Sequence, residues 1–152
     1  MTATAEESQR LLGRLRSGPT RIWDEIGLSQ HASSDSRGGW SLAQVLGHLA
    51  DAESVWQFRV KACIAEDRPH LPGWDQDRWA KAHRGSHVHG ELERWTTLRT
   101  HTVEVLGGLD PAGWGRMGIH AERGEISIAD MARILADHDE EHRHQIHDLL
   151  AR

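Results

Sequence analysis

The stretch that decides the fold is residues 127–149, SIADMARILADHDEEHRHQIHDL. One set of its positions recurs in alternating steps of three and four, which is the spacing of the buried face of an amphipathic α-helix. These positions are Ile128, Met131, Leu135, His138, His142, Gln145 and Leu149. Ser127 stands before the pattern as an N-cap, and Asp130 follows three residues later. The pattern predicts a long final helix that buries two histidines.

The two buried histidines, His138 and His142, are four residues apart, so their side chains project from one helix face one turn apart. A buried imidazole needs a partner for its ring nitrogens, and two imidazoles at this spacing can bind one metal ion. The chain contains 12 histidines, which makes chance pairs common. For this pair alone, packing and metal binding are therefore equally good interpretations.

Two helices are predicted in the first part of the chain from the same periodicity. The first covers residues 6–26 and contains Pro19, for which a kink or a short break is expected because proline cannot donate a backbone hydrogen bond. The second begins at a capping box formed by Ser41 and Gln44 and ends near Glu66.

A long crossover, residues 67–89, follows the second helix and holds a short helical segment near 75–81. Another long helix covers residues 91–106 and ends at two glycines. No run of alternating apolar and polar residues predicts a strand. The predicted fold is therefore all-α, a four-helix bundle with a long crossover between its second and third helices, in one domain spanning residues 1–152.

A third metal ligand has to come from another helix, because one rigid helix cannot surround an ion. His48 is the best candidate, since it flanks the buried face of the second helix near the start of that helix. His138 and His142 lie in the second half of the last helix. If these two helices are antiparallel, the three histidines lie at a similar depth in the bundle.

The segment 138–142, HDEEH, also matches the H-x-x-E-H pattern of one class of metalloprotease and differs from H-E-x-x-H at Asp139. We reject both readings, because the chain shows no strand pattern for a substrate-binding edge. Asp139, Glu140 and Glu141 are expected to form a solvated face. Asp137 and Asp139 could also accept hydrogen bonds from imidazole N–H groups.

Composition excludes several other classes of function. The formal net charge of −5 and the lack of a basic run argue against nucleic acid as a partner. No apolar run is long enough to span a membrane, and residues 1–10 show no secretory signal, so a cytoplasmic location is expected. Cys63 is the only cysteine and lies on an apolar helical stripe, where a packed thiol is expected.

Three segments together resemble the DinB-like (YfiT-type) superfamily. Residues 39–53, GWSLAQVLGHLADAE, resemble its second-helix signature, and residues 137–146, DHDEEHRHQI, resemble its closing motif. Residues 118–124, GIHAERG, resemble a loop of the same family, with Ala121 where proline is expected. The resemblance covers nearly the whole chain, and the segments stand in the family's order.

This resemblance implies a four-helix bundle with an up-down-down-up arrangement. It also implies a divalent metal, typically nickel or zinc, held by three histidines that carry over onto His48, His138 and His142. Family members are frequently homodimers that act on small molecules. Some are thiol-dependent transferases or isomerases that use mycothiol or bacillithiol, and others are metal-dependent hydrolases. The sequence does not choose between these reactions or name the substrate.

Several residues are candidates for supporting roles. Asp51 and Asp137 could act as general base or orient a ligand, and Glu53 could do the same or be solvated. His120 could approach the site from its loop, but an ordinary loop residue is the preferred interpretation. Three loop tryptophans could line a pocket for an apolar substrate or cover the end of the bundle, and the covering role is preferred; they are Trp74, Trp79 and Trp114. Two further readings stay open, a non-catalytic metal-binding or stress-response protein and a dimerisation module with an inactive site.

Overall fold

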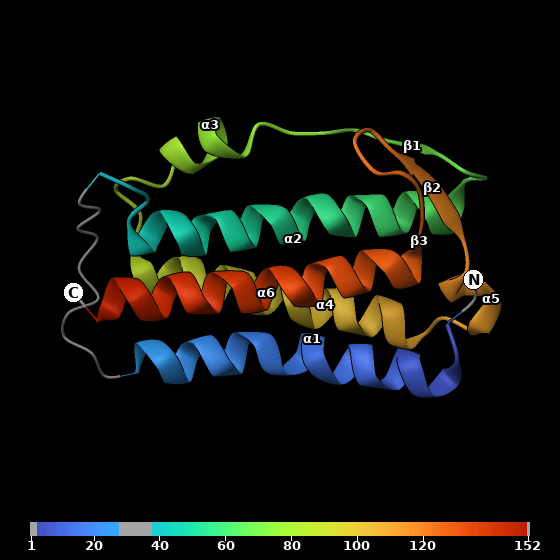
Figure 1. The fold of residues 1–152 in the computed structure, drawn as a ribbon, viewed down its shortest axis with the longest axis horizontal. Helices are drawn as coiled ribbons and strands as arrows, with labels where there is room; N and C mark the ends of the chain where they lie inside the picture. The colour runs from blue at the N-terminus through green and yellow to red at the C-terminus, as the bar shows by residue number, and fades with distance from the viewer. Residues whose placement is uncertain (1–2, 28–37, 152) are drawn as a thin grey trace.

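The computed structural model describes residues 3–27 and 38–151, and four long helices make up most of it (Figure 1). They are α1 (Ala5–Ile26), α2 (Leu42–Ala65), α4 (Val88–Gly107) and α6 (Ile128–Leu150). Helices α2 and α4 run in the same direction, opposite to α1 and α6 (Figure 1). Around the bundle, α1 packs against α4 and α6, and α2 packs against the same two helices. The predicted up-down-down-up four-helix bundle is thus confirmed.

The predicted helix starts are confirmed where capping chemistry defined them. The Ser41 hydroxyl accepts from the backbone N–H of Gln44 at 3.2 Å, and the Gln44 side chain accepts from the Ser41 N–H at 3.0 Å. Ser127 and Asp130 form the same reciprocal pair at the start of α6. Each box satisfies backbone N–H groups that a helix end otherwise leaves unpaired, so these sequence signals fix the starts of α2 and α6.

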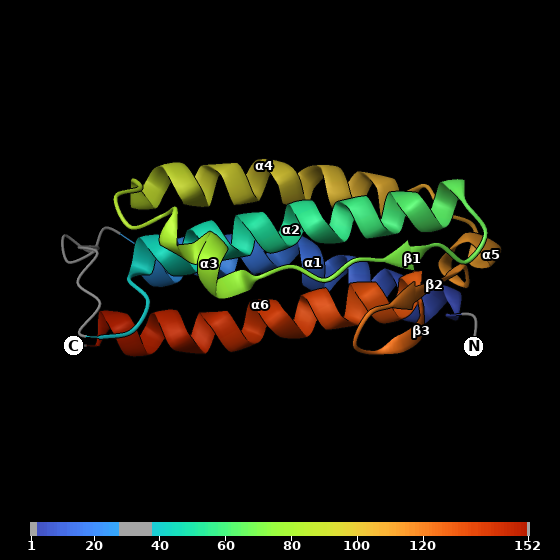
Figure 2. The same cartoon turned by 90° about the horizontal axis from the view of Figure 1, so that it is seen from above.

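The crossover from α2 to α4 runs along α2 on the side that faces α6, as the view from above shows (Figure 2). It contains β1 (His70–Leu71) and the short helix α3 (Gln76–Lys81). The Gln44 side chain donates to the carbonyl of Ala80 at 3.1 Å and so fastens α3 to the start of α2. The crossover therefore covers the side of the bundle where the sequence places its candidate ligands.

The expectation of no strands was wrong. A three-stranded sheet forms from β1, β2 (Met117–His120) and β3 (Gly124–Ser127), preceded by the short helix α5 (Pro111–Trp114). β1 pairs with β2 in parallel and β2 with β3 antiparallel, and Gly124 has a φ of 73° at the hairpin turn. Strands of two to four residues are too short to give a recognisable alternating pattern in the sequence. The pairing of β1 with β2 also joins segments that are distant in sequence.

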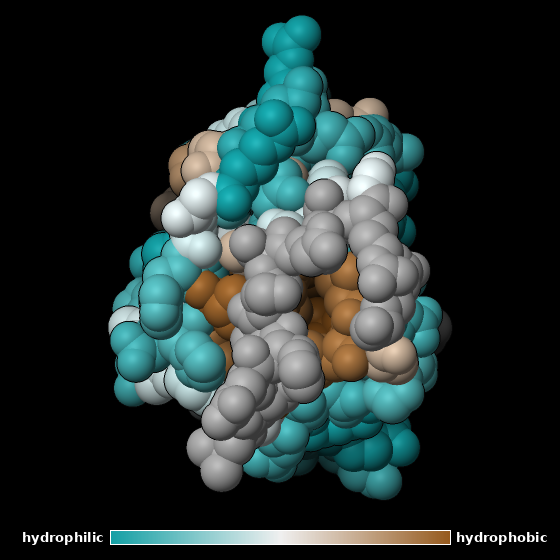
Figure 3. All heavy atoms as spheres, turned by 90° about the vertical axis from the view of Figure 1, so that its left-hand side faces the viewer, coloured by the Kyte–Doolittle hydropathy of each residue, from teal (hydrophilic) through white to brown (hydrophobic). Residues whose placement is uncertain are grey.

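Two hydrophobic clusters fill the bundle, one towards each end. The larger contains Leu12, Trp56 and Leu135, and the smaller contains Leu46 and Trp95 among others. Figure 3 views the end of the bundle where α1 finishes and α2 begins. There, hydrophobic surface lies at the centre of the face within a polar rim.

Among the described residues, no helix combines the length and hydropathy needed to cross a bilayer.

A buried ion cluster lies between the two hydrophobic clusters. The Arg99 guanidinium on α4 donates to Glu53 on α2 and to Asp139 on α6, with Nη2 at 2.8 Å from one oxygen of each. Trp95 adds an indole N–H to Glu53 at 3.3 Å. Burial raises the pKa of Asp139 to about 6, although the Arg99 charge opposes that shift. Glu53 and Asp139 are thus buried structural carboxylates, which corrects the expectation that either is solvated.

Helix α1 continues through Pro19 without the expected break. Proline leaves the carbonyl of Leu15 without its helical donor. Arg99 Nη1 supplies the missing hydrogen bond to that carbonyl at 3.0 Å. The ion cluster therefore contacts all four long helices. It also satisfies the backbone carbonyl that Pro19 leaves without a helical donor.

The ion cluster fits against α1 because residue 18 has no side chain. A Cβ atom at Gly18 would clash with the carboxylate of Asp139 and lie 3.0 Å from Arg99 Nη1. Gly13, one and a half turns earlier on the exposed face of α1, has open space around its Cβ position. The two glycines of α1 thus have opposite surroundings, and Gly18 also directly precedes Pro19, which restricts the backbone of any residue that replaces it.

We predict that Gly18→Ala lowers the free energy of unfolding by about 1–3 kcal/mol, because the added methyl displaces a buried ion pair. Gly13→Ala should instead raise it by about 0.5–1 kcal/mol, since alanine restricts the unfolded chain and meets no neighbour in the helix. Urea unfolding at pH 7 measures both. Equal stabilisation by the two substitutions would show that α1 does not pack against the ion cluster in this way.

Candidate metal centre

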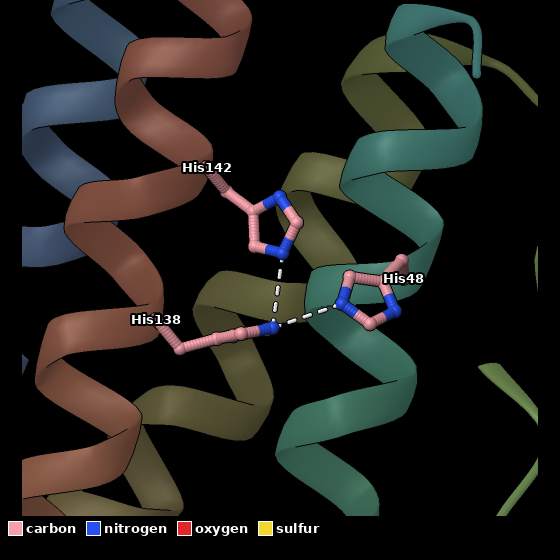
Figure 4. A group of neighbouring side chains, drawn as sticks. All are labelled: His48, His138 and His142. Atoms are coloured by element: carbon pink, nitrogen blue, oxygen red, sulfur yellow. Dashed lines mark hydrogen bonds between the residues drawn. The ribbon is translucent and has the colours of Figure 1, made fainter. Parts of the chain in front are cut away.

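Three imidazole rings point at one another across the interface between α2 and α6 (Figure 4). The Nε2 atom of His138 lies 2.9 Å from Nε2 of His48 and 3.0 Å from Nε2 of His142. All three candidate ligand atoms lie within 4.8 Å of one another. The antiparallel packing of α2 and α6 thus brings the three histidines to the same depth, as their sequence positions predicted.

Burial keeps the three rings uncharged. The His48 residue is 1% exposed, and burial lowers its pKa to about 3, with smaller contributions from His142 and His83. Burial also holds the pKa of His138 well below its usual range, helped by His142 and His48, and lowers that of His142. At neutral pH each ring therefore has one N–H and one free lone pair.

Protons alone satisfy this arrangement only through a weak three-centre hydrogen bond at His138 Nε2. An imidazole nitrogen has a single in-plane position, occupied by either a hydrogen or a lone pair. His138 Nε2 nevertheless faces two nitrogens at hydrogen-bond distance. A cation between the rings would accept all three lone pairs. A tetrahedral ion with bonds of about 2.0–2.1 Å separates its ligands by roughly 3.3 Å, close to the two distances from His138 Nε2. The donor set therefore fits a divalent metal that favours imidazole.

The surroundings of each ring fix its orientation. His142 Nδ1 lies 2.7 Å from the Gln145 side-chain oxygen, which assigns the proton to Nδ1 and the lone pair to Nε2. The His48 ring stacks on Trp74, with centroids 5.6 Å apart and planes 9° apart, and Trp40 lies 5.0 Å away. Among the described residues, Nδ1 of His48 and of His138 have no hydrogen-bond partner. Aromatic packing, rather than a carboxylate, therefore holds His48.

The structure does not bring Asp51 to the three imidazoles. Its carboxylate bonds instead to His83 Nε2 at 2.7 Å and to Arg94 Nη2 at 3.1 Å, and Glu91 contacts the other nitrogen of the same His83 ring at 3.1 Å. These contacts join α2 to the end of the crossover and to α4. The sequence predicts no hydrogen-bond partner for His83, because a histidine in a loop carries no pattern that indicates which distant carboxylate it contacts.

Asp137 lies on the surface, where it pairs with Arg14 of α1 at 2.7 Å and its side chain is 59% exposed. One residue along a helix rotates the side chain by about 100°, so the neighbour of His138 points away from the face that His138 occupies. The structure therefore shows no hydrogen bond from Asp137 to any of the three histidines, and it connects α1 to α6 instead.

A cavity of about 110 Å³ borders the three-histidine centre on the side of the crossover and the hairpin. His138 forms part of its wall. The other lining residues are Ala52, Trp56, Arg59, Gly73, Trp74, Gln76, His120, Glu122, Arg123 and Ile134. An ion at the centre would thus have a small-molecule space beside it, which a purely structural metal site lacks.

Two cavity residues correct the sequence analysis. Trp74 stacks on His48 and lines the cavity, although it was expected to cover the end of the bundle. His120 is buried and stacks on Trp56 at 5.8 Å, although it was expected to be an ordinary loop residue. Both residues lie outside the long helices, so helical periodicity does not predict their positions. The pairing of β1 with β2 positions His120, and the path of the crossover positions Trp74.

Other single residues lie away from the three-histidine centre. The side chains of His144 and His147 are 66% and 63% exposed. Cys63 is fully buried, and burial raises the pKa of its thiol. Trp114 is buried in the larger core cluster, as a covering residue would be. The histidines that share α6 with His138 thus divide between a buried and an exposed face.

Comparison with known proteins identifies relatives over the same residues. The model of the DinB superfamily matches residues 3–146. Two proteins of Oceanobacillus iheyensis named "Putative metal-dependent hydrolase" are similar. One is 30% identical over 129 residues, covering 84% of this chain and 75% of the relative. The other is 26% identical over 106 residues, covering 69% and 61%.

A solved structure has the same fold. It is YfiT from Bacillus subtilis, described as "a probable metal-dependent hydrolase with an unusual four-helix bundle topology". The TM-score is 0.86 at 21% sequence identity, and the match covers 97% of this chain and 88% of that one. The likeness therefore extends over nearly the whole length of this chain.

We predict that chelator-treated protein loses stability as the pH falls from 7 to 5. Between pH 6.5 and about 3 the unfolded chain protonates His48 and the folded chain does not, so the free energy of unfolding decreases with falling pH. His48 alone accounts for about 2 kcal/mol of this loss. Urea unfolding at both pH values measures the free energy of unfolding. Its pH dependence should be shallower for His48→Gln than for the wild type, and the control, His144→Gln, should keep the wild-type pH dependence. Identical slopes for all three proteins would contradict a buried neutral His48.

Proposed function

The chain belongs to the DinB superfamily, and we propose that it is a metal-dependent enzyme that hydrolyses a small molecule at the centre formed by His48, His138 and His142. The observation that carries this proposal is the convergence of three uncharged imidazole nitrogens, one of which belongs to a residue that lines a cavity, His138. Nickel and zinc are the metals we propose, since both accept imidazole ligands.

Bound to three neutral ligands, such an ion keeps its full double charge and supplies a Lewis acid that polarises a carbonyl or lowers the pKa of water. The residues of the chain set the conditions for that chemistry. His48, His138 and His142 would donate through Nε2, and Gln145 holds the proton of His142 on the far nitrogen. Trp40 and Trp74 pack against the His48 ring and restrict the access of bulk water.

The cavity favours an enzyme over the non-catalytic alternatives. A structural metal site is usually closed by four protein ligands, whereas a catalytic site keeps a position for water or substrate. The described residues place three candidate ligands together and leave a cavity beside them. A thiol-dependent reaction would use the same position. Cys63 is buried elsewhere in the core, so the thiol would have to be a second small molecule.

We predict about one nickel or zinc ion per chain in protein purified without a histidine tag, measured by inductively coupled plasma mass spectrometry. His48→Ala, His138→Ala and His142→Ala should each lose most of that metal, because two imidazoles rarely retain an ion against buffer. His144→Ala is the matched control on the exposed face of α6 and should keep it. Retention of full metal content by His138→Ala would place the metal elsewhere.

The same variants test the reaction. The metal-loaded protein should hydrolyse members of a panel of p-nitrophenyl esters and small amides. His138→Ala should lower the rate by at least about a hundredfold, because the Lewis acid is lost. Parallel assays with added small thiols and an alkylating electrophile separate hydrolysis from thiol transfer. Hydrolysis that survives both chelation and His138→Ala would contradict a metal-dependent mechanism.

A further inference from the structure

The cavity beside the histidines contains a buried cation, and Glu122, the carboxylate that lines the same cavity, forms no ion pair with it. Arg59 on α2 is 3% exposed, and its guanidinium lies 4.4 Å above the ring of Trp56. Its Nη2 donates to the carbonyl of Pro72 at 2.7 Å, while its Nε has no hydrogen-bond partner among the described residues. No described carboxylate forms an ion pair with it. Because a buried charge is costly when unpaired, this guanidinium is suited to receiving an anion.

A second donor stands in the same cavity. His120 Nδ1 accepts hydrogen bonds from the backbone N–H groups of Glu122 at 3.1 Å and Arg123 at 3.2 Å. An accepting Nδ1 places the ring proton on Nε2, so the imidazole is a neutral N–H donor. Burial lowers the pKa of His120, and the charges of Arg59 and Arg123 act in the same direction. The hairpin thereby fixes one tautomer of a cavity residue.

The charges and walls of the cavity limit what fits it. Arg59 and Arg123 contribute two positive charges and Glu122 one negative charge, which leaves a balance suited to a monoanion. Arg59 Nη1 and His120 Nε2 form no hydrogen bond among the described residues, and these two N–H donors match the two oxygens of a carboxylate. A phosphate dianion would bring a second charge and a third oxygen. Much of the remaining wall is apolar or aromatic and is formed by Ala52, Trp56, Trp74 and Ile134.

We propose that this cavity binds the carboxylate group of a small substrate with an apolar or aromatic body, and that Arg59 and the Nε2–H of His120 hold its oxygens. His138 borders the same cavity, so a substrate held this way extends towards the metal centre. The inference rests on the proposed function for the reaction that follows, and it names the substrate class of that site. At about 110 Å³, the cavity restricts the substrate to a small acid.

Calorimetric titration with benzoate, butyrate and acetate tests the proposal, with the neutral amide of each acid as its matched ligand. We expect at least one acid to bind about tenfold or more tightly than its amide, because a charge-assisted pair with a buried guanidinium exceeds a neutral hydrogen bond. Arg59→Met should abolish that preference and leave amide binding unchanged. Arg59→Lys should restore part of it, since lysine keeps the charge without the planar fork.

Two further variants complete the test. His120→Phe keeps an aromatic ring against Trp56 and removes the donor, so it should weaken acid binding alone. Arg14→Met alters an exposed arginine on α1 and should change nothing. Urea unfolding confirms that each variant is folded. The proposal is overturned if no acid binds better than its amide, or if the preference persists in Arg59→Met.

Titrations of metal-loaded and chelator-treated protein separate this inference from the proposed function. Acid binding that depends on Arg59 in both preparations supports the carboxylate subsite whatever the metal does. Acid binding that requires metal and ignores Arg59 means that the acid coordinates the ion, which refutes the subsite and leaves the metal site intact. A chain that binds no metal yet shows Arg59-dependent acid binding refutes the proposed function alone.

Discussion

One buried guanidinium fixes how the four helices pack. Arg99 on α4 bonds to Glu53 on α2, to Asp139 on α6 and to the backbone carbonyl of Leu15 on α1. Asp139 directly follows His138, so the bond that holds α6 against the centre of the bundle also sets the depth of its histidines. Removing one partner of such a buried cluster typically costs about 3–5 kcal/mol, a large part of a domain's total stability. The position of the candidate metal centre therefore depends on a purely structural contact.

The same burial that stabilises the bundle defines the chemistry of the three histidines. Because their pKa values are depressed, the rings stay neutral, and their Nε2 atoms converge without enough protons to pair them. A divalent ion resolves this conflict, and three neutral ligands would leave its charge undiminished. The crossover and the hairpin then enclose the remaining side. They add aromatic walls, the guanidinium of Arg59 and a neutral His120 to a site whose ligands come entirely from α2 and α6.

The sequence predicted those parts of the molecule that depend on local order. Helical periodicity and two capping boxes located α2 and α6, and the spacing of His138 and His142 identified a shared face. What it missed depends on contacts between distant segments. The partners of Glu53 and Asp139 lie on another helix, and β2, which carries His120, pairs with β1 of the distant crossover. Residue types on one helix do not reveal such partners.

Anomalous diffraction from crystals of the untagged protein, recorded on both sides of the nickel and zinc absorption edges, tests the central claim most directly. The account predicts one strong peak about 2.0–2.1 Å from Nε2 of His48, His138 and His142 alike, with an open coordination position towards the cavity. A map with no peak there would contradict it, as would a His48 ring turned to solvent away from the other two.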